Sequence, residues 1–146
     1  WWQALKYRNK AAEWSLYFMF LTGFMLWNQI SIPWPVERVL LLVHVVASLL
    51  LFPVTVVPFW LAHRALLKRS KKALLKVTGQ LIDYILVGCM ASGIYLVLQG
   101  NRGDDFDWFV YMAHLVTALV LLPLLIRHAA KWSVLKPLWS WVFKDK

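Results

Sequence analysis

The sequence contains one cysteine and few acidic residues. Because Cys89 has no second cysteine, the chain forms no internal disulfide, no zinc site with several cysteine ligands and no covalent c-type haem attachment. Asp and Glu number 7 against 16 Lys and Arg, which leaves a net charge of +9. A glycine-rich phosphate loop, a nucleophile–base pair and a carboxylate dyad are also missing. We therefore expect no self-contained catalytic centre in this chain.

Apolar sequence, in contrast, is abundant. Hydrophobic residues make up 61% of the chain and its mean hydropathy is +0.60, whereas soluble domains are roughly 45–50% apolar. A helix needs about 20 apolar residues to cross a bilayer. Four segments reach this length, so we predict an all-α membrane protein, a single domain over residues 1–146 that folds as a four-helix up-down bundle. The expected spans are about residues 11–30, 39–62, 74–98 and 108–130.

The basic residues sort by loop. They precede the first span, lie between the second and third, and follow the fourth, whereas the other two loops carry little positive charge. The positive-inside rule therefore predicts that both termini and the middle loop are cytoplasmic. Membrane lipid, not nucleic acid, is the expected partner of this charge. The tryptophans in residues 132–143 favour a short interfacial segment after the fourth span.

Four histidines lie inside or at the rim of these spans: His44, His63, His114 and His128. An ionisable residue in a membrane helix is energetically costly and marks a functional site by default. Neutral imidazole is also a usual axial ligand of haem iron. Single histidines in membrane helices also serve as packing or interfacial residues, so their spacing has to separate the two interpretations.

The two halves of the chain align without a gap at an offset of 70 residues, with repeat units at about 4–69 and 74–139. Apolar matches between membrane helices mean little, but rarer residues match too. These pairs are Glu13 with Asp83, Gly23 with Gly93, His44 with His114, and Pro53 with Pro123. We infer an internal duplication of a helical hairpin, with a pseudo-twofold axis along the membrane normal.

The duplicated glycines and histidines are expected at one depth. His44 and His114 lie about six residues into inward-going helices, and Gly23 and Gly93 lie about six residues before the ends of outward-going ones, roughly 9 Å below the outer surface. Two imidazoles then face each other, and the glycines leave room for a flat macrocycle between four helices. Close helix packing is the alternative explanation for the glycines.

The second pair of histidines fits less regularly. His114 and His128 are 14 residues apart, which sets them about 40° apart on one helix face and about 21 Å apart along the axis. This separation suits two haems stacked across a bilayer. His44 and His63 are 19 residues apart and roughly 100° out of phase. Two prolines between them can kink or rewind the helix, which would let His63 face His128.

Two arginines adjoin the inner histidines. Arg64 follows His63 and Arg127 precedes His128. Both would suit haem propionates, which pair well with guanidinium groups. An equally simple explanation for both arginines is that they are ordinary charges at the cytoplasmic ends of their helices.

These residues resemble a known family. The run Glu13-Trp14 followed by Leu21-Thr22-Gly23, together with a last helix whose histidines are 14 residues apart, is similar to the cytochrome b subunits of membrane-bound formate dehydrogenases and nickel-iron hydrogenases. The resemblance implies a four-helix bundle in a bacterial inner membrane with two b haems, which passes electrons between a periplasmic redox subunit and quinone. It also implies that His44 and His114 hold the outer haem and that His128 is one ligand of the inner haem.

One departure from the family concerns the inner haem. The family's first helix usually begins with His-Trp, and that histidine completes the inner haem, whereas this chain has Glu13 at the matching position. A carboxylate is a poor substitute for imidazole at a low-spin haem. Either His63 supplies the missing ligand or the inner haem is absent.

The sequence thus predicts an electron-transfer subunit, a b-type haem cytochrome that works between a partner redox subunit and the quinone pool, with a quinone site near one haem. Two other classes stay open. One is a transporter or channel that uses the histidines as a proton relay. The other is a structural membrane subunit that binds lipid or pigment.

The short loops imply a partner, because they are too small to form a soluble redox domain. The outer loop with Asp104, Asp105 and Asp107 is the expected docking place for a periplasmic multihaem cytochrome c or iron–sulfur protein. Glu13 and Asp83, near the inner side, are candidates for proton exchange with quinol. Charges that merely mark the helix ends are the simpler explanation for both.

Overall fold

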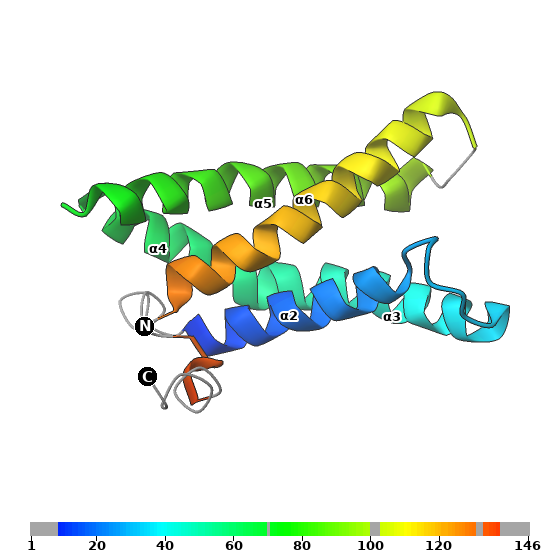
Figure 1. The fold of residues 1–146 in the computed structure, drawn as a ribbon, viewed down its shortest axis with the longest axis horizontal. Helices are drawn as coiled ribbons and strands as arrows, with labels where there is room; N and C mark the ends of the chain where they lie inside the picture. The colour runs from blue at the N-terminus through cyan, green and yellow to red at the C-terminus, as the bar shows by residue number, and fades with distance from the viewer. Residues whose placement is uncertain (1–8, 70, 100–102, 131–132, 138–146) are drawn as a thin grey trace.

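The computed structural model describes residues 9–69, 71–99, 103–130 and 133–137. Within these ranges the chain is helical and contains no strand. The elements in order are α2 (Asn9–Met25), α3 (Trp34–Leu51), the π-helical turn η1 (Phe52–Val56), α4 (Val57–Arg69), α5 (Ala73–Gln99) and α6 (Asp105–Ala129). Because α3, η1 and α4 follow one another without a gap, they form one continuous helical rod (Figure 1).

Three of the described helical rods are long and apolar enough to cross a membrane: Trp34–Lys68, Ala73–Gln99 and Asp105–Ala129. Many of their large apolar side chains are exposed, as a surface in contact with lipid requires. These features indicate an all-α membrane protein. α2 has 17 residues, fewer than the roughly 20 that cross a bilayer. Length and composition therefore identify three of the four expected spans in the described part of the chain.

Helix ends depend on local chemistry that hydropathy does not report. α3 begins at Trp34, a few residues before the expected span. Its first turn contains Pro35, and proline suits this position because the N–H groups of a first turn have no partner within the helix. α6 begins at Asp105, again before the expected span, because the side chain of Asp104 caps its first turn. The interfacial segment expected at 132–143 lies mainly outside the described residues.

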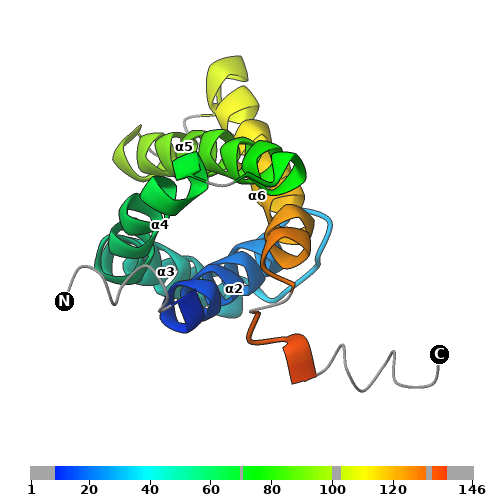
Figure 2. The ribbon, with the colours of Figure 1, turned by 90° about the vertical axis from the view of Figure 1, so that its left-hand side faces the viewer.

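The helices pair as two hairpins. α2 packs along α3 and η1, and α5 packs along α6 (Figure 1). Viewed along the bundle, the rods surround a common axis (Figure 2). Contacts between the hairpins are fewer, and they join α2 to α6 and α4 to α5. The hydrophobic core is correspondingly small and centres on Ala12, Met19, Val56, Leu86 and Leu121. The interface between the hairpins is therefore the least densely packed part of the molecule.

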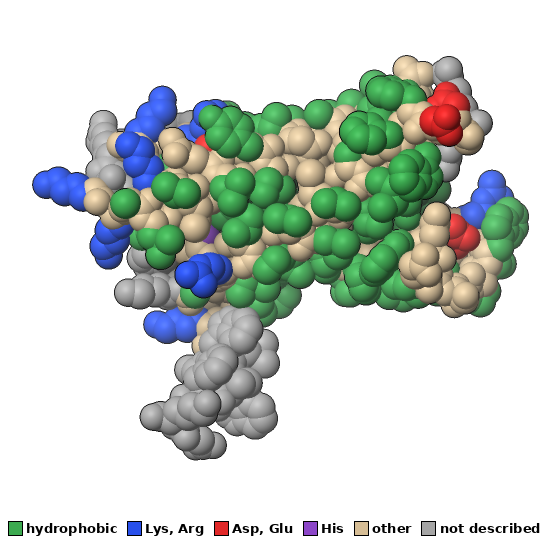
Figure 3. All heavy atoms as spheres, turned by 45° about the horizontal axis from the view of Figure 1, so that its top comes forward, with side chains coloured by type: hydrophobic (Ala, Val, Ile, Leu, Met, Phe, Trp, Pro, Cys, Tyr) green, Lys and Arg blue, Asp and Glu red, His purple; other side chains and the backbone are tan. Residues whose placement is uncertain are grey.

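Charged side chains separate toward the two ends of the molecule. Most of the visible Lys and Arg side chains gather at the end where α4 stops and α5 starts, and the acidic side chains in view lie mainly at the opposite end (Figure 3). This distribution agrees with the sorting of basic residues by loop. Which end faces the cytoplasm stays a prediction of the positive-inside rule.

Candidate functional site: two histidine pairs

The outer histidine pair bridges the two hairpins. His44 lies on α3 and His114 on α6, and their ring centroids are 6.3 Å apart with the ring planes inclined by 76°. Both side chains are partly buried. Two residues 70 positions apart in the sequence therefore meet across the interface between the hairpins.

The inner pair also bridges the hairpins. His63 on α4 and His128 on α6 have ring centroids 6.0 Å apart and planes inclined by 85°. The imidazole of His63 stacks on the Phe59 ring, with centroids 5.2 Å apart. The structure thus brings all four histidines together as two couples of nearly perpendicular rings.

The π-helical turn η1 explains how His63 reaches its partner. The Val57 N–H donates to the Phe52 carbonyl, a bond over five residues that puts one extra residue into the turn. The missing N–H of Pro53 within this turn already weakens a regular helix there. The extra residue takes up about 100° of rotation around the helix axis. The 19 residues from His44 to His63 therefore turn the chain as far as 18 residues of regular α-helix would, which is about five full turns. Both histidines therefore lie on the same side of the rod.

Hydroxyl groups on the neighbouring helix hold three of the four imidazoles. Thr22 Oγ1 lies 3.0 Å from His44 Nδ1, Thr78 Oγ1 lies 3.0 Å from His128 Nδ1, and Ser92 Oγ lies 3.2 Å from His114 Nδ1. The Cys89 carbonyl is also 2.9 Å from His114 Nδ1. Every one of these contacts uses Nδ1.

The hydroxyl protons decide the tautomer of these rings. Each hydroxyl donates its only proton to a backbone carbonyl one turn back in its own helix, at 2.8–2.9 Å. The oxygen can then only accept from the imidazole, so Nδ1 carries the proton and Nε2 keeps its lone pair. Neutral imidazole with Nδ1–H bonded to a neighbour is the form in which histidine ligates metals through Nε2.

Sequence reasoning did not assign a role to these hydroxyls. Thr22, Thr78 and Ser92 each stand directly before a glycine, so a Ser/Thr-Gly step recurs three times in the two hairpins' first helices. This repeated dipeptide is the signal that could have found them. Their pairing with histidines follows only from the antiparallel register of each hairpin.

The glycines of these steps make room for the imidazoles. A Cβ at Gly23 would lie 2.8 Å from His44 Cε1, and one at Gly93 would lie 2.9 Å from His114 Cε1. A Cβ at Gly79, which sequence reasoning also missed, would lie 3.2 Å from His128 Cε1. The first two contacts are closer than real Cβ atoms come, so glycine lets the ring sit against the helix. Contact of Gly23 and Gly93 with a macrocycle stays a prediction.

The His63 ring differs from the other three. Its Nδ1 is buried and has no hydrogen-bond partner among the described residues. A buried ring nitrogen without a partner is energetically unfavourable. The inner pair is therefore less completely held than the outer pair.

The spacing of both pairs suits a metal ion between two imidazoles. A ligating ring nitrogen lies about 2 Å from its metal, as in zinc sites, and the ring centroid lies about 1 Å behind it, so opposed imidazoles have centroids roughly 6 Å apart. The observed separations are 6.3 and 6.0 Å. In the described ranges, no three His, Cys, Asp or Glu side chains lie close enough together to hold a metal ion. Two-histidine sites suit a metal that brings its remaining ligands with it, as porphyrin iron does.

The two arginines near the inner pair differ in their surroundings. Arg64 Nε forms an ion pair with Asp83 Oδ2 at 3.2 Å, and its guanidinium lies 5.2 Å from the centre of a Trp60 ring. Arg127 is exposed on α6. Arg64 is thus partly engaged by the protein itself, and the binding of propionates by either arginine stays a prediction.

Glu13 and Asp83 connect the two hairpins. Glu13 is 4% exposed and accepts hydrogen bonds from the Tyr17 hydroxyl at 2.7 Å, from the Ser133 hydroxyl, and from the Val134 N–H at 3.0 Å. Asp83 on α5 accepts from Trp60 Nε1 at 2.6 Å in addition to its ion pair with Arg64. Asp83 joins α5 to α4, and Glu13 joins α2 to the segment that follows α6, a role that goes beyond marking a helix end.

Contacts recur at the 70-residue offset. Thr22 bonds His44 and Ser92 bonds His114, and each ring lies against the glycine that follows its hydroxyl residue. In the same way Glu13 accepts a hydrogen bond from the Val134 N–H, and Asp83 forms an ion pair with Arg64, which lies 70 residues before Val134. The recurrence supports the predicted duplication with contacts between residues of the two hairpins.

The acidic outer loop is only partly available to a partner. Asp107 is 1% exposed and accepts a hydrogen bond from the Tyr95 hydroxyl at 3.1 Å. The Asp104 carboxylate accepts from the Asp107 N–H at 2.7 Å as the cap of α6. Asp105 is exposed. The expectation that all three carboxylates form a docking surface is therefore wrong for Asp107, whose side chain is buried.

Comparisons with known proteins do not identify the chain: no family model, no curated protein and no solved structure matches it.

Proposed function

We propose that this chain is the electron-transfer subunit of a membrane oxidoreductase, a cytochrome that binds two b-type haems between its hairpins. The observation that carries the proposal is the meeting of four histidines as two couples at 6.3 and 6.0 Å. His44 and His114 would hold the outer haem, and His63 and His128 the inner one. Haem iron supplies one-electron redox chemistry when it is bound.

The chain's own residues prepare these positions. Thr22 and Ser92 hold the Nδ1 protons of the outer pair and so leave Nε2 free to act as the ligand atom. A flat macrocycle would lie between the hairpins, where the helices make the fewest contacts. Gly23 and Gly93 keep bulk away from the imidazoles, and Arg64 and Arg127 lie near the inner pair, where cations stabilise propionates.

We also propose the complete architecture: a four-span bundle with both termini in the cytoplasm of a bacterial inner membrane. α2 lies along α3 in both ribbon views, as the fourth member of a bundle would (Figures 1 and 2). The gathering of Lys and Arg at one end supports the orientation.

Electron transfer requires a donor and an acceptor. The proposed partners are quinone in the membrane and a redox subunit, such as a multihaem cytochrome c or an iron–sulfur protein, on the outer face near the exposed Asp105. Asp83 is bonded to α4 and Glu13 to the segment after α6, so both fit a structural role better than proton exchange with quinol.

A reduced-minus-oxidised visible spectrum of the purified protein tests the proposal. We expect the bands of two low-spin b haems, with one lost in His114→Ala and one lost in His128→Ala. Val116→Ala, which changes an exposed apolar residue of the same helix, is the matched control and should keep both haems. Haem is quantified by extraction, and helical content is checked by circular dichroism.

Other outcomes point to other functions. A colourless protein that moves protons across vesicle membranes, with His114→Ala abolishing the flux, would establish a histidine relay instead. A colourless protein without any flux would leave a structural subunit that binds lipid or pigment. Either result would refute the haem proposal.

A further inference from the structure

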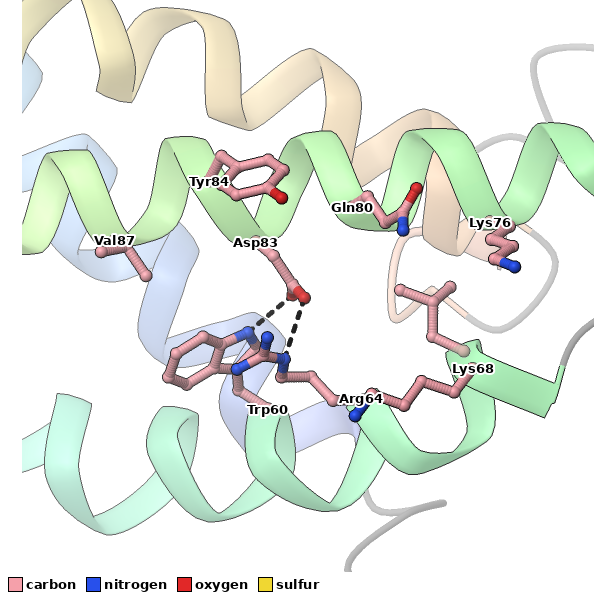
Figure 4. Close-up of a pocket in the computed structure, with 9 residues that line it drawn as sticks. Trp60, Arg64, Lys68, Lys76, Gln80, Asp83, Tyr84 and Val87 are labelled. Carbon is pink, nitrogen blue, oxygen red and sulfur yellow. Dashed lines mark hydrogen bonds and ion pairs between the residues drawn. The ribbon is translucent and has the colours of Figure 1, made fainter.

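A pocket of about 310 Å³ opens between α4 and α5, at the basic end of the molecule (Figure 4). Three cationic side chains line it: Arg64 and Lys68 from α4, and Lys76 from α5. Asp83 is the one carboxylate in its wall. The pocket therefore carries a net positive charge.

Two of these cations have no acidic partner. Arg64 already pairs with Asp83, and the dashed lines in Figure 4 show how that carboxylate is held between Arg64 and Trp60. Lys68 and Lys76 are exposed and form no ion pair with any described residue. Because they belong to different helices, both walls of the pocket carry a lysine. An anion bound there would be neutralised from both walls.

Apart from the Gln80 amide, the rest of the pocket wall is apolar or aromatic. Leu67 is 8% exposed, whereas Tyr84 and Val87 on α5 are 77% and 41% exposed. Both lie on a helix that is long and apolar enough to cross the membrane, so this side of the pocket continues into the surface that contacts lipid. A ligand that suits both parts has an anionic head and an apolar tail.

We propose that this pocket binds an anionic phospholipid, with its phosphate between Lys68 and Lys76 and its acyl chains along Tyr84 and Val87. Basic pockets between membrane helices on the cytoplasmic side suit phospholipid headgroups. A neutral ligand such as quinone would accept hydrogen bonds from the ammonium groups but has no charge to neutralise them. The proposal does not depend on haem binding: the pocket shares Arg64 with the proposed inner haem site, but Lys68 and Lys76 do not belong to that site.

Lipid binding to the delipidated, detergent-solubilised protein tests the proposal. The probe is phosphatidylglycerol, with phosphatidylcholine as the zwitterionic comparison, and bound lipid is counted by native mass spectrometry. Each lysine near an anionic phosphate contributes about 1 kcal/mol. We therefore expect the K68Q/K76Q double variant to bind phosphatidylglycerol roughly 10-fold to 30-fold more weakly. The K71Q/K72Q variant removes the same charge from exposed positions outside the pocket wall and should bind like the parent protein.

Further measurements distinguish a phospholipid from free phosphate as the ligand. Inorganic phosphate at millimolar concentration should not displace the lipid, because the apolar wall contributes to binding. Equal weakening in both double variants would mean a general surface attraction and would overturn the proposal. So would full displacement by inorganic phosphate, or binding of phosphatidylcholine as tight as that of phosphatidylglycerol.

Discussion

Thr22 and Ser92 occupy equivalent positions in the two hairpins, and they hold their histidines in the same way. The His44 ring has the Thr22 hydroxyl and the Met19 backbone as partners, and the His114 ring has the Ser92 hydroxyl and the Cys89 carbonyl. Loss of a residue that orients a metal-ligating histidine typically weakens metal binding 10-fold to 100-fold. A second acceptor at each ring should soften that loss.

At the residue scale, Thr22→Val and Ser92→Ala should therefore each lower the affinity of the outer site for haem by about 10-fold, the small end of that range. In both variants a backbone group, at Met19 or Cys89, still holds the ring. Haem titration of the apoprotein, followed by its visible spectrum, measures both. A loss of about 100-fold in either variant would show that the hydroxyl alone holds the imidazole.

At the element scale, the decisive feature is the one extra residue in η1. The turn brings His63 into phase with His44, and regular α-helix over the same 19 residues would turn it away by about 100°. The length of the segment between the two histidines should therefore matter more than its composition.

Inserting one alanine after Thr55 should rotate His63 by about 100° and separate it from His128. Deleting Val54, which is 71% exposed, should let the segment form regular helix with an 18-residue interval and keep the pair together. The expected haem content is one per chain for the insertion and two for the deletion. His44 precedes η1 and His114 lies on another helix, so the haem of the outer pair is the internal control. Two haems in the insertion variant would refute the phase argument.

At the scale of the whole molecule, polar contacts hold the hairpins together where packing is sparse. Glu13 is the most buried of these groups, and its partners Ser133 and Val134 come from the other end of the sequence. Removing the carboxylate leaves several buried donors without an acceptor. A buried donor that has lost its charged acceptor strongly destabilises the folded state.

Glu13→Ala should accordingly lower the free energy of unfolding by about 2–4 kcal/mol. Glu13→Gln, which keeps an acceptor oxygen, should lose less. Glu37→Ala removes an exposed carboxylate from the first turn of α3 and is the matched control. Denaturant unfolding in detergent micelles, followed by circular dichroism, measures all three. A Glu13→Ala variant as stable as the control would mean that this contact does not hold the hairpins together.

Much of the architecture could be predicted from the sequence because it depends on local properties. Apolar length predicts the membrane helices, and the 70-residue offset relates the hydroxyl, glycine and histidine positions that make equivalent contacts in both hairpins. The 14-residue interval between His114 and His128 sets their common face, since α6 stays helical through Pro123. These inferences need only the geometry of one helix at a time.

Other features were decided by the tertiary structure. Whether Pro53 would kink, rewind or leave its helix unchanged depends on packing against α2, so the sequence left His63 about 100° out of phase. The hydroxyl partners of the imidazoles follow from the register of each hairpin, and the burial of Glu13 and Asp107 follows from residues far away or on a neighbouring helix. Composition and periodicity thus determined a helical membrane protein with histidines in its spans. Only the contacts between helices decided that these histidines meet as two pairs, because such contacts depend on rotation and register.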